Sequence, residues 1–267
     1  MKENLLHGKN IAVFASYGAI GKVVAETLAN KGAHVFISGR NQEKLSLLEQ
    51  KIKSTGGKVT SKIVDATNED EVAYFLGYIK KEGKELSGVF NAIGTMMKGK
   101  DHVKPALKIT VDLFRKYFDN MVISQFITSR EAAKIMSAQK YGSIVLMSAT
   151  PSQGVAPLIP GPSTAHAAVD GLGRCLATEW GPMGIRVNSI MSGGMTETPN
   201  IKQVHAGMAR EMNVPLDVMI ENTSMQSALR RGPSVQETAE VVSFLLSDNA
   251  SSITGAIINS SCGAIID

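Results

Sequence analysis

Residues 10–21 read NIAVFASYGAIG, and this stretch decides the fold. Residues 11–15 form a continuous apolar run, and the short segment Ser16-Tyr17-Gly18 follows it before a helical pattern begins at Ala19. A continuously apolar strand is typical of a parallel sheet covered on both faces. Small residues in the first strand-to-helix turn let the backbone approach a diphosphate at the N-terminus of the helix. The stretch therefore predicts the first unit of a dinucleotide-binding fold. A turn packed tightly for structural reasons alone would look similar, because only Gly18 and Gly21 are glycines.

The same alternation of short apolar runs and helical patterns continues to the end of the chain. We expect strands at residues 10–15, 34–38, 59–64, 88–91, 143–147, 186–190 and 256–259. We expect helices at residues 19–31, 42–54, 68–81, 113–137, 163–180 and 235–246. This alternation is the pattern of an α/β fold. We therefore predict one α/β domain over residues 1–267, a Rossmann-type doubly wound parallel sheet of about seven strands with helices on both faces.

The composition excludes several classes of function. The chain is 43% hydrophobic and 19% charged, as is usual for a globular protein. Its net charge is +4, but the basic residues are spread along the chain and only 5% of residues are aromatic, so we expect no nucleic-acid partner. Cys175 and Cys262 have no zinc-site spacing, which predicts no metal and a reducing compartment. The N-terminus lacks an apolar signal segment and no apolar run could span a bilayer, so we expect a cytoplasmic protein with no membrane partner.

The end of the second predicted strand indicates which dinucleotide is bound. Dinucleotide folds place an acid there for the ribose of NAD, or an arginine near the 2′-phosphate of NADP. The sequence here is Ser38-Gly39-Arg40, with no acid. A solvated arginine at a helix start would give the same pattern, but a cation at a helix N-terminus opposes the helix dipole. The segment therefore favours NADP(H) over NAD(H).

These residues together resemble the short-chain dehydrogenase/reductase family, nearly from end to end. The family's glycine-rich turn falls on residues 14–21, its asparagine segment on residues 91–94, and its most recognisable segment on residues 167–188. The resemblance implies a single dinucleotide-binding domain and a homotetramer. It also implies a set of cofactor contacts: Ala15, Ser16, Tyr17, Gly18, Ile20, Gly21, Arg40, Asp65, Ala66, Asn91, Ala92, Ile93, Gly94, His166, and Thr196 or Thr198.

The family's catalytic residues carry over only in part. Its members use a catalytic set of Asn, Ser, Tyr and Lys. The tyrosine transfers the proton, and the lysine lowers the pKa of that tyrosine. The family register places Pro162 at the tyrosine and His166 at the lysine. The serine position falls on Ala149 or one of its neighbours. The resemblance therefore implies an altered catalytic set: Asn120, His166, Ser148 and Thr150.

His166 is the residue that we expect to replace the tyrosine and lysine. Imidazole can transfer protons near neutral pH, and its ordinary pKa of about 6.5 predicts a turnover that changes between roughly pH 5.5 and 7.5. The alternative is that His166 is a surface residue in the first turn of its helix.

The substrate is expected to be apolar. Residues 148–182 are similar to the 2,4-dienoyl-CoA reductase branch of the family, which keeps a lysine where this chain has His166. Methionines gather in a substrate loop around residues 192–230, and Met96 and Met97 follow the fourth strand. Flexible thioethers suit an irregular apolar ligand, although helix packing explains them equally well. The expected function is an NADP(H)-dependent oxidoreductase acting on an apolar carbonyl or enoyl substrate by a non-standard proton path. The alternative is an NADP(H)-binding homologue without redox activity.

Overall fold

The computed structural model describes residues 4–82, 85–95, 103–154 and 156–266. In this part of the chain, seven parallel strands form one sheet in the order β3-β2-β1-β4-β5-β6-β7. The strands are β1 (Asn10–Phe14), β2 (His34–Gly39), β3 (Lys58–Ile63), β4 (Gly88–Asn91), β5 (Gly142–Ala149), β6 (Ile185–Ser192) and β7 (Ile257–Ser260). The helices are α1 (Ala19–Asn30), α2 (Gln42–Ser54), α3 (Glu69–Lys81), α4 (Val111–Tyr117), α5 (Ile123–Gln139), α6 (Pro160–Trp180), α7 (Pro199–Met212), α8 (Leu216–Met225) and α9 (Val235–Leu246). The predicted fold class is confirmed.

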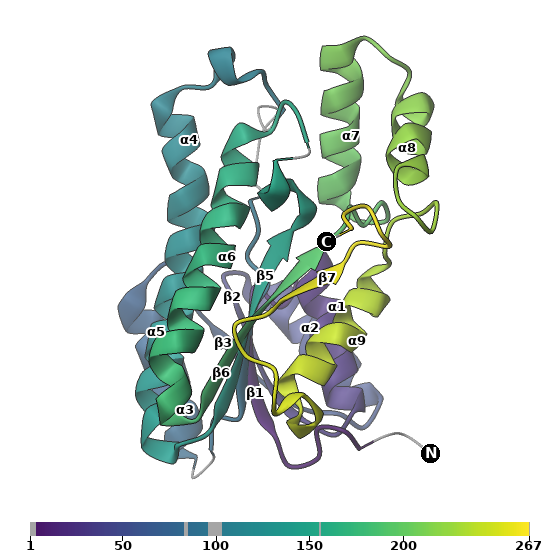
Figure 1. Ribbon diagram of the computed structural model, residues 1–267. Helices are drawn as coiled ribbons and strands as arrows, with labels where there is room; N and C mark the ends of the chain where they lie inside the picture. The colour runs from purple at the N-terminus through teal and green to yellow at the C-terminus, as the bar shows by residue number, and fades with distance from the viewer. Residues whose placement is uncertain (1–3, 83–84, 96–102, 155, 267) are drawn as a thin grey trace.

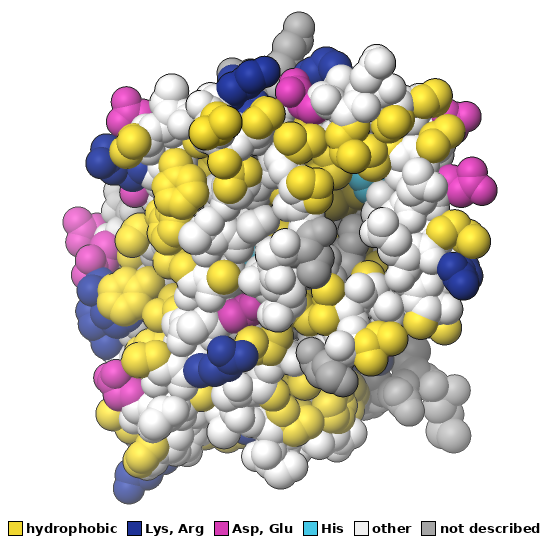
Figure 2. Space-filling model, turned by 45° about the horizontal axis from the view of Figure 1, so that its top comes forward, with side chains coloured by type: hydrophobic (Ala, Val, Ile, Leu, Met, Phe, Trp, Pro, Cys, Tyr) yellow, Lys and Arg dark blue, Asp and Glu magenta, His cyan; other side chains and the backbone are white. Residues whose placement is uncertain are grey.

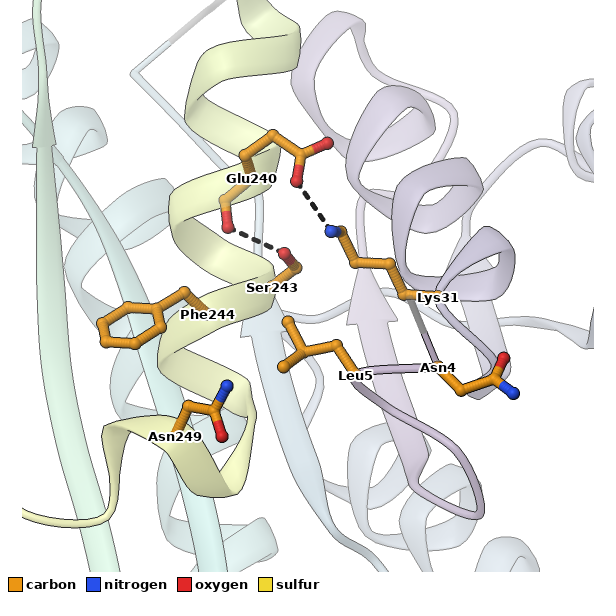
Figure 3. A pocket seen from close by; sticks show the side chains of 7 residues that line it. All are labelled: Asn4, Leu5, Lys31, Glu240, Ser243, Phe244 and Asn249. Carbon is orange, nitrogen blue, oxygen red and sulfur yellow. Dashed lines mark hydrogen bonds and ion pairs between the residues drawn. The ribbon is translucent and has the colours of Figure 1, made fainter. Parts of the chain in front are cut away.

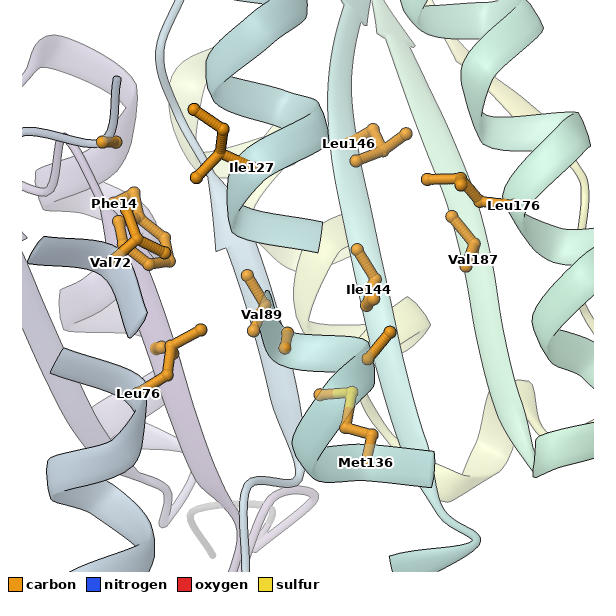
Figure 4. Packing of buried hydrophobic residues seen from close by; sticks show 14 of the residues in the cluster. Phe14, Val72, Leu76, Val89, Ile127, Met136, Ile144, Leu146, Leu176 and Val187 are labelled. Carbon is orange, nitrogen blue, oxygen red and sulfur yellow. The ribbon is translucent and has the colours of Figure 1, made fainter. Parts of the chain in front are cut away.

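Helices cover both faces of the sheet, as Figure 1 shows. Alternate residues of β1 point to opposite faces, so Ile11 and Val13 pack with α1, α2 and α9. Ala12 and Phe14 pack with the other layer, which contains α3, α5 and α6 (Figure 4). Burial of apolar side chains in both layers explains why the strands read as continuous apolar runs.

The long helix expected at residues 113–137 is interrupted. A π-helical turn, Phe118–Val122, joins α4 to α5. Helix α6 also begins at Pro160, three residues before the expected start at residue 163. Proline is favoured in a first helical turn because its missing N–H has no partner there in any case. This earlier start moves His166 out of the first turn.

The strand order places the candidate site at one edge of the sheet. From β1 the chain adds β2 and then β3 on one side of β1, and it then crosses to add β4 on the other side. The strand order therefore reverses between β1 and β4. Ligands of open parallel sheets bind outside the carboxyl ends of the strands at this point. Helices α7 and α8 stand over the same edge in Figure 1. They show that the segment expected to be a substrate loop is largely helical.

A depression of about 490 Å³ lies at the opposite, amino edge of the sheet (Figure 3). It is open to solvent, and the ion pair between Lys31 and Glu240, 2.9 Å from Nζ to Oε2, crosses it. Leu5 and Phe244 line it beside these charges. It therefore lies away from the strand ends where a dinucleotide would bind. None of the helices that the structure describes is long and apolar enough to cross a membrane.

Candidate active site

The turn between β1 and α1 brings its backbone close together. A Cβ at Gly21 would overlap the carbonyl oxygen of Ala15 and stand 2.9 Å from Cα of Ser16. Ala15 itself has φ +53°, a conformation in which glycine is usually preferred. The buried Ser16 hydroxyl donates to the carbonyl oxygen of Ser38 at 2.7 Å and ties this turn to β2. Ser16 therefore holds the turn in shape with its side chain, whereas Gly18 and Ile20 lie half-buried at the helix start.

The end of β2 places Arg40 beside this turn. Its side chain is 74% exposed, and Nη1 lies 3.5 Å from Oδ2 of Asp65, one of the predicted cofactor contacts. Burial would raise the pKa of Asp65, but hydrogen bonds from Thr67 and the charge of Arg40 hold it below its ordinary value. Asp65 is therefore charged, and it holds the loop after β3 together. Ala66 beside it is buried in the apolar layer.

Asn91 at the end of β4 has its side chain committed to the fold. Its Nδ2 donates to Oγ1 of Thr128 at 3.0 Å, and its Oδ1 accepts from the N–H of Ile93 at 2.8 Å. Gln125 donates to the carbonyl oxygen of Asn91 at 3.2 Å. These bonds shape the segment containing Ala92, Ile93 and Gly94, and they leave the predicted cofactor contact there to backbone atoms. Met96 and Met97 lie outside the described residues.

Asn120 lies in the π-helical turn between α4 and α5. Such turns are rare and occur often at functional sites. The preceding Tyr117 is fully buried, and its ring lies against Gly161 in the first turn of α6, where any Cβ would overlap it. The π turn and α6 are thus packed together, which brings the Asn120 segment next to the helix that carries Pro162 and His166.

His166 is buried, contrary to the alternative of a surface position. Its side chain is 8% exposed, and within the described residues Nδ1 has no hydrogen-bond partner. Burial lowers the pKa of His166 to about 4. The imidazole is therefore neutral at physiological pH, and the ordinary pKa from which the range of pH 5.5 to 7.5 was expected does not apply to it. The sequence could not show this because the burial arises only when α6 packs against the rest of the fold.

Asp170 is a buried carboxylate that the sequence analysis missed. It lies one turn after His166 on the same face of α6 and is 4% exposed. Neither oxygen has a hydrogen-bond partner in the described chain, although the hydroxyls of Ser148 and Ser152 lie near enough to favour its charged form. Burial outweighs them and raises the pKa of Asp170. Its spacing of four residues from His166 was the available signal.

The two residues predicted beside the serine position differ in their surroundings. Ser148 is completely buried, and its hydroxyl donates to the main-chain oxygen of His166 at 3.5 Å. It therefore faces α6 from within the protein. Thr150 is half-buried in the short helical turn after β5, and Ala149 ends that strand. The structure brings Ser148 and His166 together and leaves Thr150 nearer the surface.

The two candidate threonines after β6 also have different roles. The Thr198 hydroxyl donates to the carbonyl oxygen of Met195 at 2.8 Å and accepts from the N–H of Ile201, so it caps α7. Thr198 is buried, whereas Thr196 is exposed. Thr196 is therefore the threonine whose side chain faces outward.

An apolar cluster lies between the segment before α6 and the helices α7 and α8. It is formed by Val103, Ile159, Met208, Ala209 and Met219. Figure 2 shows apolar side chains gathered on this side of the molecule. Only part of the predicted methionine group contributes, because Met195 packs in the layer around α1 and α9, and Met212 and Met225 are exposed.

A hydrogen-bonded pair of lysine and tyrosine exists in this chain, but at the wrong edge of the sheet. The ammonium of Lys9 donates to the hydroxyl of Tyr141, and that hydroxyl donates to Asp248 at 2.9 Å. These residues precede β1 and β5 and follow α9, so they lie at the amino edge of the strands. Burial raises the pKa of Tyr141. This pair joins elements of the fold and lies away from the carboxyl ends of the strands.

Comparison with known proteins identifies the family. A family model described as enoyl-(acyl carrier protein) reductase matches residues 14–264. The chain belongs to the short-chain dehydrogenase/reductase family of oxidoreductases. The expected resemblance is confirmed, and so is the Rossmann-type sheet that it implied.

Known relatives of this short-chain dehydrogenase/reductase align over nearly the whole chain. It is 29% identical to a probable 2,4-dienoyl-CoA reductase of Bacillus subtilis, over 94% of both chains. It is also 29% identical to a 3-oxoacyl-[acyl-carrier-protein] reductase of Rickettsia felis, over 98% of both chains. The crystal structure of sorbitol-6-phosphate 2-dehydrogenase from Erwinia amylovora superposes with a TM-score of 0.89 at 23% identity, covering 96% of this chain and all of that one. The last of these shows a shared fold.

Within the described residues, no group of three or more His, Cys, Asp or Glu side chains could hold a metal ion. The polar groups around α6 include an imidazole, a carboxylate and hydroxyls: His166, Asp170, Ser148 and Ser152. Burial lowers the pKa of His166 and raises the pKa of Asp170.

Proposed function

We propose that the protein is an NADP(H)-dependent oxidoreductase acting on an apolar carbonyl or enoyl substrate. The observation that carries the cofactor assignment is the end of β2, where buried Gly39 offers no acid and exposed Arg40 follows. A ribose 2′-hydroxyl is usually held by an acid at this place, and a 2′-phosphate by an arginine nearby. The planar guanidinium of Arg40 suits the phosphate.

The residues of the first turn fit a dinucleotide. Gly21 permits a close approach that any Cβ would prevent, and the turn leads directly into the N-terminus of α1. Backbone groups of residues 15–20 would hold the diphosphate, Asp65 and Ala66 would lie by the adenine, and Thr196 would meet the carboxamide. When bound, the nicotinamide supplies or accepts a hydride.

The apolar cluster beneath α7 and α8 supports an apolar substrate. Met208 and Met219 are both nearly buried there, and Ile159 joins them from the segment before α6. Unbranched thioether side chains adapt to irregular apolar shapes. An apolar wall next to the carboxyl edge of the sheet would hold an acyl or alkyl chain while its carbonyl or enoyl group faces the nicotinamide.

His166 is the residue that we propose in the proton path. Because its pKa is about 4, it acts as a neutral imidazole, which has one N–H donor and one acceptor nitrogen. Such a ring can accept a hydrogen bond at one nitrogen while it donates from the other. Asn120, in the π turn, would hold a water beside it. His166→Ala is expected to lower turnover at least tenfold, about 1.4 kcal/mol of barrier.

The alternative is an NADP(H)-binding protein without redox activity. Two residues favour this alternative. By the family register, Pro162 stands at the tyrosine position and has no acidic hydrogen, and His166 stands at the lysine position and is neutral. NADPH oxidation measured with a panel of apolar ketones and enoyl thioesters separates the two proposals. Firm binding of NADPH without oxidation across the panel would favour the alternative.

The cofactor assignment is tested by isothermal titration with NADPH and NADH. We expect the protein to bind NADPH more tightly, and we expect Arg40→Ala to remove most of the preference. Arg115→Ala is the matched control, because Arg115 is an exposed arginine on α4. Equal affinities of the unmodified protein for the two dinucleotides would contradict the assignment.

A further inference from the structure

The side chain of Tyr17 lies across the end of β2. A Cβ placed at Gly39 would overlap Cε1 of Tyr17 and stand 2.9 Å from its Cδ1. The contact is built by the sheet, since Tyr17 follows β1, Gly39 ends β2 and these strands are hydrogen-bonded neighbours. Tyr17 is half-buried against the apolar layer that contains α1. Any side chain at position 39 would therefore have to displace the ring.

The hydroxyl of Tyr17 is aligned by the backbone. It accepts a hydrogen bond from the N–H of Arg40 at 3.2 Å, so its own proton remains to be donated outward. The ammonium of Lys44 lies 5.7 Å from the centroid of the same ring. A hydroxyl, a guanidinium and an ammonium thus belong to residues at or next to the end of β2. A phosphate carries only acceptor oxygens and is matched by such a group of donors.

The ion pair between Arg40 and Asp65 does not prevent this use. The two groups are 3.5 Å apart, and the side chain of Arg40 is 74% exposed. Exposed ion pairs contribute little to stability, so the guanidinium can exchange a carboxylate for a phosphate at small cost. Asp65 retains its hydrogen bonds from Thr67 when this happens.

We propose that Tyr17 is a specificity-determining residue that selects the 2′-phosphate of the dinucleotide. Its ring fills the space that an acid at position 39 would need to bind an unphosphorylated ribose. Its hydroxyl joins Arg40 and Lys44 in binding the phosphate. The proposal rests on the proposed function, because it presumes that a dinucleotide binds at this edge of the sheet.

The overlap makes Tyr17 and Gly39 dependent on each other. Gly39→Asp alone introduces the acid that binds a ribose diol, but the ring occupies the acid's position. The acid can take up that position only when the ring is removed as well. The two substitutions are therefore expected to be strongly non-additive in NADH affinity, as is usual for residues in direct contact.

The test is isothermal titration of NADPH and NADH with five variants: Tyr17→Phe, Tyr17→Ser, Gly39→Asp, the double variant Tyr17→Ser/Gly39→Asp, and Tyr74→Phe as control. Tyr74 is an exposed tyrosine on α3. Tyr17→Phe is expected to weaken NADPH about tenfold, as for a lost hydrogen bond to a charged group, and to leave NADH unchanged. Gly39→Asp alone should not improve NADH binding, whereas the double variant should. Circular dichroism establishes that each variant is folded.

Two results would overturn the inference. One is that Gly39→Asp binds NADH as tightly as the double variant does, because the ring would then not occupy the acid's place. The other is that Tyr17→Phe and Tyr17→Ser keep the NADPH preference of the unmodified protein. The titration of the unmodified protein separates these from failure of the proposed function. If it binds neither dinucleotide, the proposed function is wrong, and the inference falls with it.

Discussion

Burial of His166 makes the stability of the protein sensitive to acid. The pKa of His166 is about 4 in the folded protein, against an ordinary value of 6.5 for an accessible imidazole. The unfolded chain therefore binds a proton at a higher pH than the folded protein does. The stabilising contribution is complete above pH 6.5, decreases as the pH falls, and is lost below about pH 4.

The magnitude follows from the difference between the two pKa values. A difference of about 2.5 units between the two pKa values corresponds to about 3 kcal/mol over the full range. Between pH 7 and pH 5, the expected loss from this one residue is about 2 kcal/mol. His166→Gln, which has no titrating group near this pH, is expected to lack that loss.

Urea unfolding at pH 7, 6 and 5, at one protein concentration, measures the effect. Trp180 is the chain's single tryptophan and is buried at the end of α6, so its fluorescence reports unfolding. The exposed His7 provides the matched control, His7→Gln. If His166→Gln loses as much stability between pH 7 and pH 5 as the unmodified protein does, His166 is not buried as a neutral group and the reasoning fails.

Three other outcomes are expected. Burial raises the pKa of Asp170, so the unmodified protein loses stability as the pH rises through the pKa of the folded protein. Asp170→Asn should therefore gain stability relative to the unmodified protein from pH 4 to pH 7 in the same urea experiment. A difference in stability that stays constant over this range would contradict this expectation. Gly21→Ala should destabilise the fold by about 1–3 kcal/mol through overlap with the carbonyl of Ala15, as thermal unfolding would show, whereas Gly77→Ala, with open space around its Cα, should not. Light scattering at micromolar concentration should detect a homotetramer, and a monomer would refute that expectation.

The sheet was predictable from the sequence because both of its faces are buried. Each strand reads as an apolar run that differs clearly from the amphipathic helices, and their alternation indicates a parallel sheet. Boundaries were less predictable where tertiary contacts decide them. Helix α6 starts at Pro160 rather than at residue 163, and the preference of proline for a first helical turn was the local signal for that start.

For the candidate site, the sequence could predict which residues lie at the ends of strands, but not what their side chains contact. Arg40 was placed at the end of its strand from its position along the chain, whereas the resemblance to the family implied Asp65 and Asn91. What each side chain does depends on neighbours distant in sequence. Asn91 is held by Thr128, and Tyr17 faces Gly39 because two strands pair, so neither relation has a local signal. The burial that changes the pKa of His166 likewise arises only when α6 packs on the sheet.

The π-helical turn Phe118–Val122 makes the orientation of α4 depend on the number of residues between α4 and α5, rather than on which residues they are. A π turn closes its hydrogen bond over one residue more than an α turn does. Deleting any one residue between 118 and 122 would let a regular α-helix run from Val111 to Gln139, with α4 rotated by about 100° relative to α5. Tyr117 would then leave Gly161. Two chains that differ only by one inserted residue here can therefore be identical at all other positions and still present a different surface beside α6.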